Sequence, residues 1–178
     1  MKLFYLTFFL LLYIFPCNIN SQEQGSVSLQ KKIIPYTKPY NDLKRETLEK
    51  RDHFRTQYEQ NQKKDSILLD AQKYLLNISD DFFRSWYNTP WTFHGHSQIP
   101  KEGSIACGYF VTTTLRDMGF NIPRIKWAQQ ASEYLIKKVS TDISRFHKKP
   151  MKDIVDFIAN KGEGLYIVGL DQHVGYIY

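Results

Sequence analysis

The chain has 178 residues, 42% of them hydrophobic, which is enough for one domain with a real core. Its 24 basic and 18 acidic residues give a net charge of +6 at neutral pH. This excess is moderate and does not indicate a nucleic-acid partner. A basic protein of this kind is drawn instead to anionic surfaces, a bacterial wall among them.

Residues 1–21 have the features of a secretory signal peptide. Lys2 supplies the charged start, residues 3–15 form an apolar run, and Pro16 breaks it. The run is shorter than the roughly 20 residues that span a membrane. We therefore predict cleavage after Ser21 and a secreted or periplasmic chain of charge +5 without an integral membrane span. The alternative is a lipid anchor on Cys17, although the residues before it lack the small side chains that such a site prefers.

A polar N-terminal arm is predicted for residues 22–64, before a domain at 65–178. Residues 22–40 are rich in Gln, Ser, Lys and Pro and indicate a flexible segment. The stretch Asp42–Arg51 has the charge spacing of a solvated helix. The apolar positions of Ser66–Leu76 predict an amphipathic helix, a cap at Asn77–Asp80, and then a short aromatic helix to Tyr87.

Residues 88–103 carry two prolines and two glycines and are predicted to form a loop before the most regular helix of the chain. Ser104 is the predicted N-cap, and Gly119 the C-terminal stop. The apolar stripe of this helix has helical spacing and consists of Cys107, Phe110, Val111, Thr114, Leu115 and Met118.

Three further elements are predicted after this helix. A second amphipathic helix runs from Pro123 or Trp127 to Lys138, and a third from Pro150 to Asn160. Residues 165–168 and 173–178 are rich in β-branched and aromatic side chains and are separated by Gly169–Gln172. This pattern predicts an antiparallel hairpin, so the expected fold class is α+β.

Cys107 is the candidate nucleophile. Once the leader is removed it is the single remaining cysteine, and its predicted place is the first turn of a helix. The partial positive charge of the helix N-terminus and a nearby imidazole would both favour the thiolate, and the Cys107 backbone amide could donate to an oxyanion. His173 is the candidate base. From the residues alone the alternatives stay open, because Cys107 could fill the core and His173 could simply be a polar residue on an edge strand.

Three segments together resemble the NlpC-type, papain-like cell-wall cysteine peptidases over residues 90–178. They are the aromatic loop Pro90–Gly95, the helix start Ala106–Val111 and the strand His173–Ile177. The resemblance implies a papain-like α+β fold, in which the helix that bears the cysteine packs on a small antiparallel sheet. It also implies hydrolysis of amide bonds in peptidoglycan stem peptides or related peptides, with no cofactor. In this scheme Cys107 is the nucleophile and His173 the general base and acid.

The resemblance also implies a substrate cleft or oxyanion region formed by Trp91, Phe93, His94, His96 and Gly108. The sequence departs from the family pattern in that Ala106 and Gly108 flank the cysteine. The third polar residue of the family follows the histidine strand, and none is found before Tyr178. We therefore expect a fragment or a degenerate member of the family.

Two other functions remain open from the sequence. Trp86, Tyr87, Trp91 and Phe93 could stack on sugars, which would make the chain a non-catalytic wall-binding or interaction module on the same fold. His94, His96 and His173 could hold zinc. We expect no metal site, because two histidines in a glycine-containing loop more often face solvent.

Overall fold

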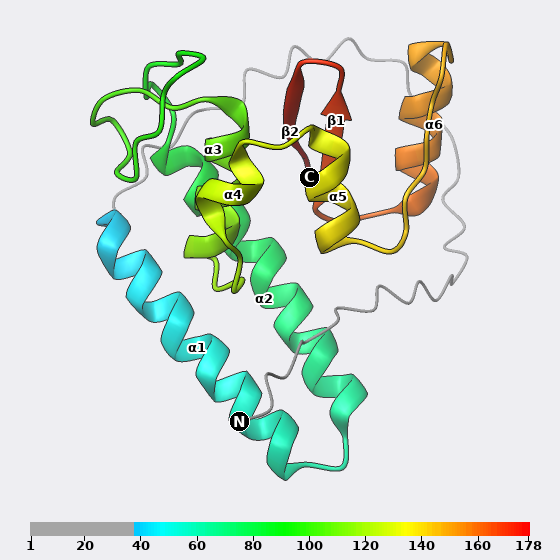
Figure 1. Ribbon diagram of the computed structural model, residues 1–178. Coiled ribbons are helices and arrows are strands. Elements are labelled where there is room, and N and C mark those ends of the chain that lie inside the picture. The colour runs from blue at the N-terminus through cyan, green and yellow to red at the C-terminus, as the bar shows by residue number, and fades with distance from the viewer. Residues whose placement is uncertain (1–37) are drawn as a thin grey trace, which may run out of the picture. The chain divides into compact units, whose positions relative to one another are not determined.

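The computed structural model describes residues 38–178, so the predicted leader, Cys17 and the segment up to residue 37 lie outside the described residues. Within them the chain is α+β, with helices preceding a two-stranded antiparallel sheet (Figure 1). The elements in chain order are α1 (Tyr40–Gln60), α2 (Lys64–Ser85), α3 (Cys107–Asp117), α4 (Arg124–Ala128), α5 (Ser132–Val139), α6 (Met151–Lys161), β1 (Tyr166–Leu170) and β2 (His173–Ile177).

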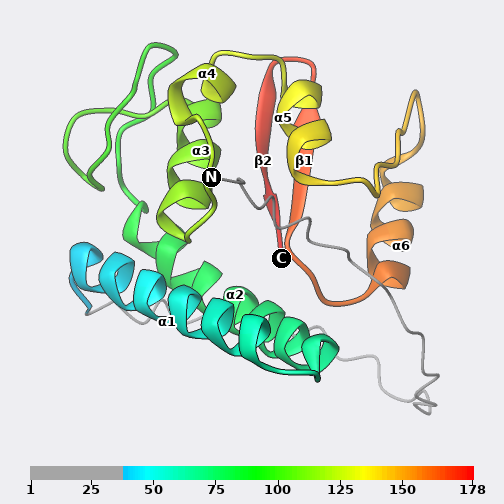
Figure 2. The same cartoon turned by 60° about the horizontal axis from the view of Figure 1, so that its bottom comes forward.

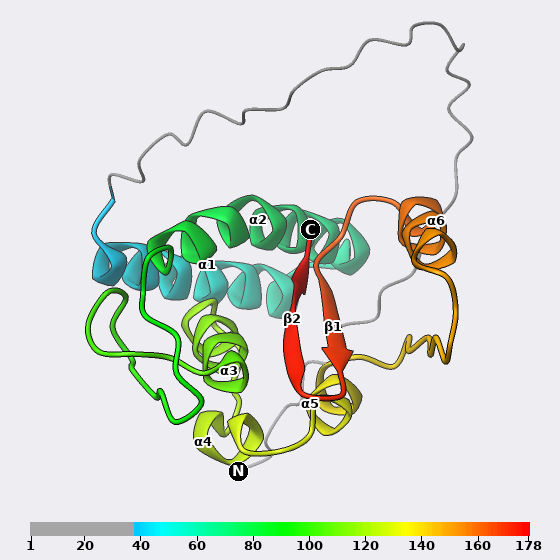
Figure 3. The ribbon, with the colours of Figure 1, turned by 90° about the horizontal axis from the view of Figure 1, so that it is seen from above.

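The long helices α1 and α2 lie side by side, as Figures 1 and 3 show. Charged residues cover most of α1, but Leu43 and Thr47 are buried, and the Thr47 hydroxyl donates to the Leu43 carbonyl. Tyr40 packs against the same core and donates a 2.8 Å hydrogen bond to Asp117 of α3. The residues expected to form a solvated helix thus also contribute to the core.

Helix α2 is continuous where the sequence predicts two helices with a cap between them. Two polar residues of the predicted cap make side-chain bonds within the helix. Ser79 donates to the Leu75 carbonyl one turn earlier, and Asp80 pairs with Arg84 one turn later. The neighbouring Ile78 is buried in the core, and its burial favours continuation of the helix through this point.

Helix α3 is the most buried helix and contacts both α4 and β2. Its bounds confirm the predicted helix, although its N-cap is Ala106 rather than Ser104. Thr112 and Thr114 are fully buried, and their hydroxyls donate to carbonyls one turn earlier in the helix, which lowers the cost of burying them. Gly119 has a φ of 99°, the left-handed conformation in which glycine commonly ends a helix.

One predicted helix over residues 123–138 is two helices in the structure. Helix α4 ends at Ala128 and α5 begins at Ser132, with extended backbone at Ala131. The break lets α5 turn onto the sheet, where the Ser132 hydroxyl bonds the Leu170 carbonyl and Leu135 is buried. Helix α6 agrees with its prediction and is followed by Gly162, where φ is 87°.

The hairpin pairs β1 with β2 in the register Tyr166 to Ile177 through Leu170 to His173. Val174 and Tyr176 pack into the core with residues from α2, α3 and α5. In Figures 2 and 3 the hairpin lies between α3 and α6. None of the helices within residues 38–178 combines the length and the apolar character that a membrane span requires.

Candidate functional site

The loop between α2 and α3 has a fixed hydrogen-bonded structure. Ile105 forms isolated β-bridges with both Trp91 and His96, and its amide donates 2.9 Å to the Pro90 carbonyl. The Ser104 hydroxyl lies 2.8 Å from that of Thr92. These contacts fold the loop back on itself directly before Cys107.

Gly95 lies where the first part of this loop passes close to the backbone of Ser104 and Ile105, and only glycine fits there. It is buried, and the Ala106 amide donates 2.9 Å to its carbonyl. A Cβ at this position would lie 2.5 Å from the Ile105 amide nitrogen, closer than real Cβ atoms come. The glycine predicted to mark a loop therefore allows a close backbone approach.

Arg124 of α4 holds the same loop through hydrogen bonds to its backbone. Its Nη2 donates 2.9 Å to the His96 carbonyl and 2.8 Å to the Ser97 carbonyl. Its Nε donates 2.6 Å to the Thr113 hydroxyl of α3. One buried side chain thus links the loop to two helices.

The loop presents large apolar side chains to solvent. Trp91 is 62% exposed and Phe93 is 77% exposed. His94 is also exposed and packs edge-on against the Phe93 ring, with centroids 5.1 Å apart. His96 is exposed, and its Nδ1 lies 3.1 Å from the His94 carbonyl oxygen. The structure therefore gathers the predicted cleft residues Trp91, Phe93, His94 and His96 on one loop.

Cys107 is the first residue of α3 and follows this loop directly. It is a free cysteine of intermediate burial and packs against the core beside Phe110. Gly108 marks a close contact between helices, because a Cβ there would lie 2.4 Å from the Ala128 carbonyl oxygen of α4. The structure thus gives the predicted cleft residue Gly108 a packing role.

His173 opens β2 and is exposed. Side chains alternate along a strand, so His173 and Gly175 share one face while Val174 and Tyr176 share the other. Val174 is buried, and the Tyr176 hydroxyl bonds the α3 backbone at Val111. A Cβ on Gly175 would lie 3.8 Å from His173 Nε2, which places the ring over Gly175.

The structure does not pair the two predicted catalytic residues. Helix α3 and β2 contact each other, and in Figure 1 both begin at the same end of the fold. However, the His173 ring lies on the face of β2 opposite the side chains that contact α3. No hydrogen bond joins it to the Cys107 thiol within the described residues.

No group of three or more histidine, cysteine or carboxylate side chains within residues 38–178 is arranged to hold a metal ion. The histidines considered for zinc, His94, His96 and His173, accordingly form no such group. Comparison with family models, curated proteins and solved structures finds no match for this chain.

Sequence reasoning missed the role of Arg124. The sequence around it, from Pro123 onward, indicates only the start of an amphipathic helix. The contacts of Arg124 reach residues 11, 27 and 28 positions earlier in the chain. No local spacing records such contacts, so only a fold-level prediction could have found them.

Proposed function

We propose that this chain is an exported interaction module that binds peptidoglycan or a related wall peptide through the loop of residues 88–106. The observation that carries the proposal is the exposure of Trp91 and Phe93 on a loop that is otherwise tied down by hydrogen bonds. Large apolar side chains held rigidly in water are typical of recognition surfaces.

The chemistry of the loop fits a wall polymer. Aromatic rings such as Trp91 and Phe93 offer flat apolar faces on which the apolar faces of sugar rings can pack. The loop loses little conformational entropy on binding, because Arg124 and Ile105 already fix its backbone. The net positive charge adds attraction to anionic wall polymers. Export by the predicted leader would bring the chain to this partner.

Co-sedimentation with purified peptidoglycan tests the proposal. We expect Trp91→Ala and Phe93→Ala each to weaken binding about tenfold, which is typical of a central aromatic contact. Met151→Ala is the matched control, since Met151 on α6 is 72% exposed and lies outside the loop. Equal binding by all three variants and the parent chain would refute the proposal.

A second candidate function is the thiol amidohydrolase that the family resemblance implies, on a papain-like fold. It is favoured by the place of Cys107, a partly exposed thiol that begins α3 where the aromatic loop ends. The thiolate would attack the amide carbonyl, the His173 imidazolium would protonate the leaving amine, and water would then hydrolyse the thioester on Cys107 to release the carboxylate. This reaction requires a rearrangement at the start of β2 that brings the His173 ring from its place over Gly175 to the thiol.

Digestion of muropeptides separates the two candidates. For the hydrolase, Cys107→Ala and His173→Ala both abolish release of stem-peptide fragments while peptidoglycan binding persists. For the interaction module, the parent chain binds but releases no fragments. Activity that survives in Cys107→Ala would remove the thiol mechanism.

A further inference from the structure

Helix α6 lies at the periphery of the described fold, beyond the hairpin, as Figures 1 and 3 show. None of its residues is buried. It is linked to the segment that precedes it, because Lys161 forms a 2.7 Å ion pair with Asp142. The Phe157 ring also packs on that of Phe146, with centroids 5.0 Å apart. The helix is thus held in place without being part of the buried core.

The apolar side of α6 is wider than the part that the protein covers. Ile154, Phe157 and Ile158 have helical spacing and are half-buried. Beside them, Met151 is 72% exposed and Val155 is 55% exposed. Met151 and Val155 are four residues apart and therefore share one face of the helix. We call these two residues the α6 stripe, and the described fold leaves both in contact with water.

The carboxylates of α6 do not place unpaired negative charge beside the stripe. Asp153 is two residues from both Met151 and Val155, so it lies on the opposite side of the helix. Asp156 forms an ion pair with Lys152. An anionic surface could therefore approach the stripe without facing an unpaired carboxylate of this helix.

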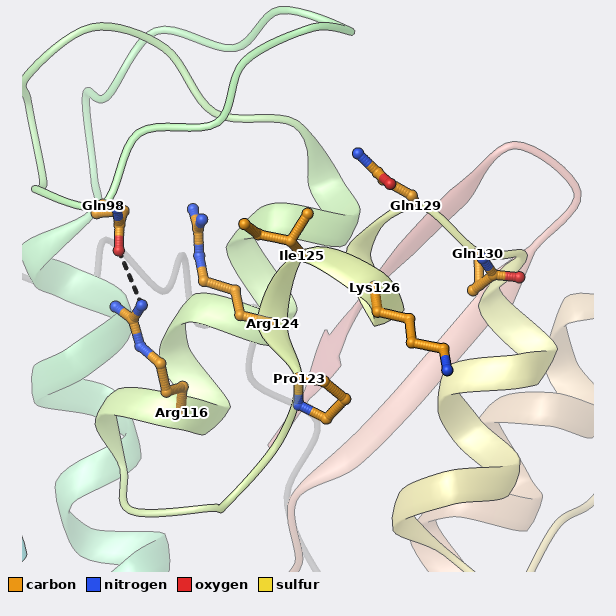
Figure 4. Close-up of a pocket in the computed structure, with 8 residues that line it drawn as sticks. All are labelled: Gln98, Arg116, Pro123, Arg124, Ile125, Lys126, Gln129 and Gln130. Atoms are coloured by element: carbon orange, nitrogen blue, oxygen red, sulfur yellow. Dashed lines mark hydrogen bonds between the residues drawn. The ribbon is translucent and has the colours of Figure 1, made fainter.

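Two lysines precede α6 at the end where the stripe begins. The side chains of Lys148 and Lys149 are exposed, and within residues 38–178 neither forms a hydrogen bond or an ion pair. Arg116, drawn in Figure 4, differs in that it donates 2.9 Å to Gln98 and 2.8 Å to Asp117. We call Lys148 and Lys149 the lysine pair, and their ammonium groups are available to an external anion.

Lys148 has a backbone conformation that suits glycine better than lysine. Its φ is 53°, in the left-handed region. There the Cβ of an L-residue crowds the following carbonyl oxygen, whereas glycine adopts this conformation freely. Since no polar contact within the described part of the chain explains a lysine at this position, its side chain points to a contact outside the chain.

We propose that the α6 stripe and the lysine pair together bind the surface of a bilayer that contains anionic lipids. The stripe enters the boundary between headgroups and acyl chains, and the lysines approach the lipid phosphates. A polyanion in solution would attract the lysines but would offer no apolar medium to Met151 and Val155. The bilayer is therefore the partner that fits both features. A chain exported by the predicted leader would meet such a surface on the outer face of the membrane that it has crossed.

Co-sedimentation with lipid vesicles tests the proposal. The chain, purified after export, is mixed with vesicles of phosphatidylcholine alone or of phosphatidylcholine with phosphatidylglycerol. We expect binding to the anionic vesicles that is at least about tenfold tighter than to the neutral ones and that weakens with salt. Lys148→Gly should weaken it about fivefold, the contribution of one lysine near an anionic surface. Met151→Asp should weaken it about tenfold or more, because the stripe then carries a charge.

Each of these variants has a matched control. Lys101→Gly removes the same charge from another exposed lysine in the left-handed region, where φ is 65°. Leu69→Asp places the same charge on α2, where Leu69 is 50% exposed. Both controls should change the affinity less than about twofold. Circular dichroism shows whether all four variants keep the fold, which the exposure of the substituted residues leads us to expect.

Three results would overturn the proposal. The first is the absence of binding to the anionic vesicles, or equal binding to both kinds. The second is a loss in the controls as large as that in the α6 variants, which would show a response to net charge or to general surface polarity. The third is a loss in Lys148→Gly with none in Met151→Asp, which would indicate a polyanion rather than a bilayer as the partner.

Discussion

The Tyr176 hydroxyl of β2 donates a 3.0 Å hydrogen bond to the Val111 carbonyl oxygen of α3 and lies 3.0 Å from the Thr114 hydroxyl. This is a polar tie between the hairpin and the helix that carries Cys107. It fixes which face of β2 meets α3, and by strand alternation it directs His173 to the other face. The hydrogen bonds of the Tyr176 hydroxyl thus help to keep the candidate base, His173, away from the candidate nucleophile, Cys107.

Replacement of Tyr176 by phenylalanine should lower the free energy of unfolding by about 1 kcal/mol. The ring would keep its stacked contact with Phe83, with centroids 4.6 Å apart, so the loss isolates the hydroxyl. Urea unfolding measures the change. Tyr134→Phe is the control, since no side-chain hydrogen bond of that hydroxyl is found in the described part of the chain. If Tyr176→Phe were as stable as the parent chain, the hydrogen bonds of the Tyr176 hydroxyl would not stabilise the fold.

Stability should fall as the pH rises above 10, the ordinary pKa of tyrosine. Burial raises the pKa of Tyr176 and of Tyr40, so the folded chain keeps both protons where the unfolded chain loses them. The stabilisation is therefore complete below pH 10 and declines as the pH rises toward the folded pKa values. Each such tyrosine contributes a slope of up to about 1.4 kcal/mol per pH unit.

Comparison with Tyr176→Phe assigns this slope. The variant lacks the titrating group, so its stability should fall less steeply, and its difference from the parent chain should shrink with rising pH. Urea unfolding at pH values on either side of 10 measures both curves. If the stability of the two chains fell equally with pH, Tyr176 would lose its proton as easily in the folded chain as in the unfolded one.

The elements that the sequence predicts well are those with their own local stop signals. Gly119 follows the end of α3 and Gly162 follows the end of α6, both with positive φ, and Pro150 precedes α6. The hairpin follows from β-branched and aromatic residues on either side of a short turn. In each case the information lies within a few residues of the element.

The features that the sequence predicts poorly depend on distant contacts. The polar residues Ser79 and Asp80 resemble a cap, yet burial of Ile78 carries α2 through them. Similarly, the direction of His173 depends on which face of β2 meets the core. Both faces of β2 carry aromatic or branched side chains, so periodicity alone does not decide between them.

Gly108→Ala should destabilise the chain by about 1–3 kcal/mol, the usual cost of an overpacked contact. In a helix, alanine is more stable than glycine by up to about 1 kcal/mol. Here, however, the alanine Cβ would lie 2.4 Å from the Ala128 carbonyl oxygen. Chemical unfolding measures the difference. Gly175→Ala is the control, because the nearest atom to its Cβ is 3.8 Å away, an ordinary contact. A Gly108→Ala chain as stable as the parent would show that α3 and α4 are not so close.

Alkylation of Cys107 by iodoacetamide reports whether His173 acts on the thiol in solution. The reagent attacks the thiolate, so an imidazole that takes the thiol proton accelerates the reaction. Because the His173 ring lies over Gly175 and no hydrogen bond joins it to Cys107 in the described part, His173→Ala should change the rate less than about twofold. His94→Ala controls for effects of the neighbouring loop. A fall of about tenfold or more in His173→Ala alone would mean that the ring turns toward the thiol, and would favour the hydrolase over the interaction module.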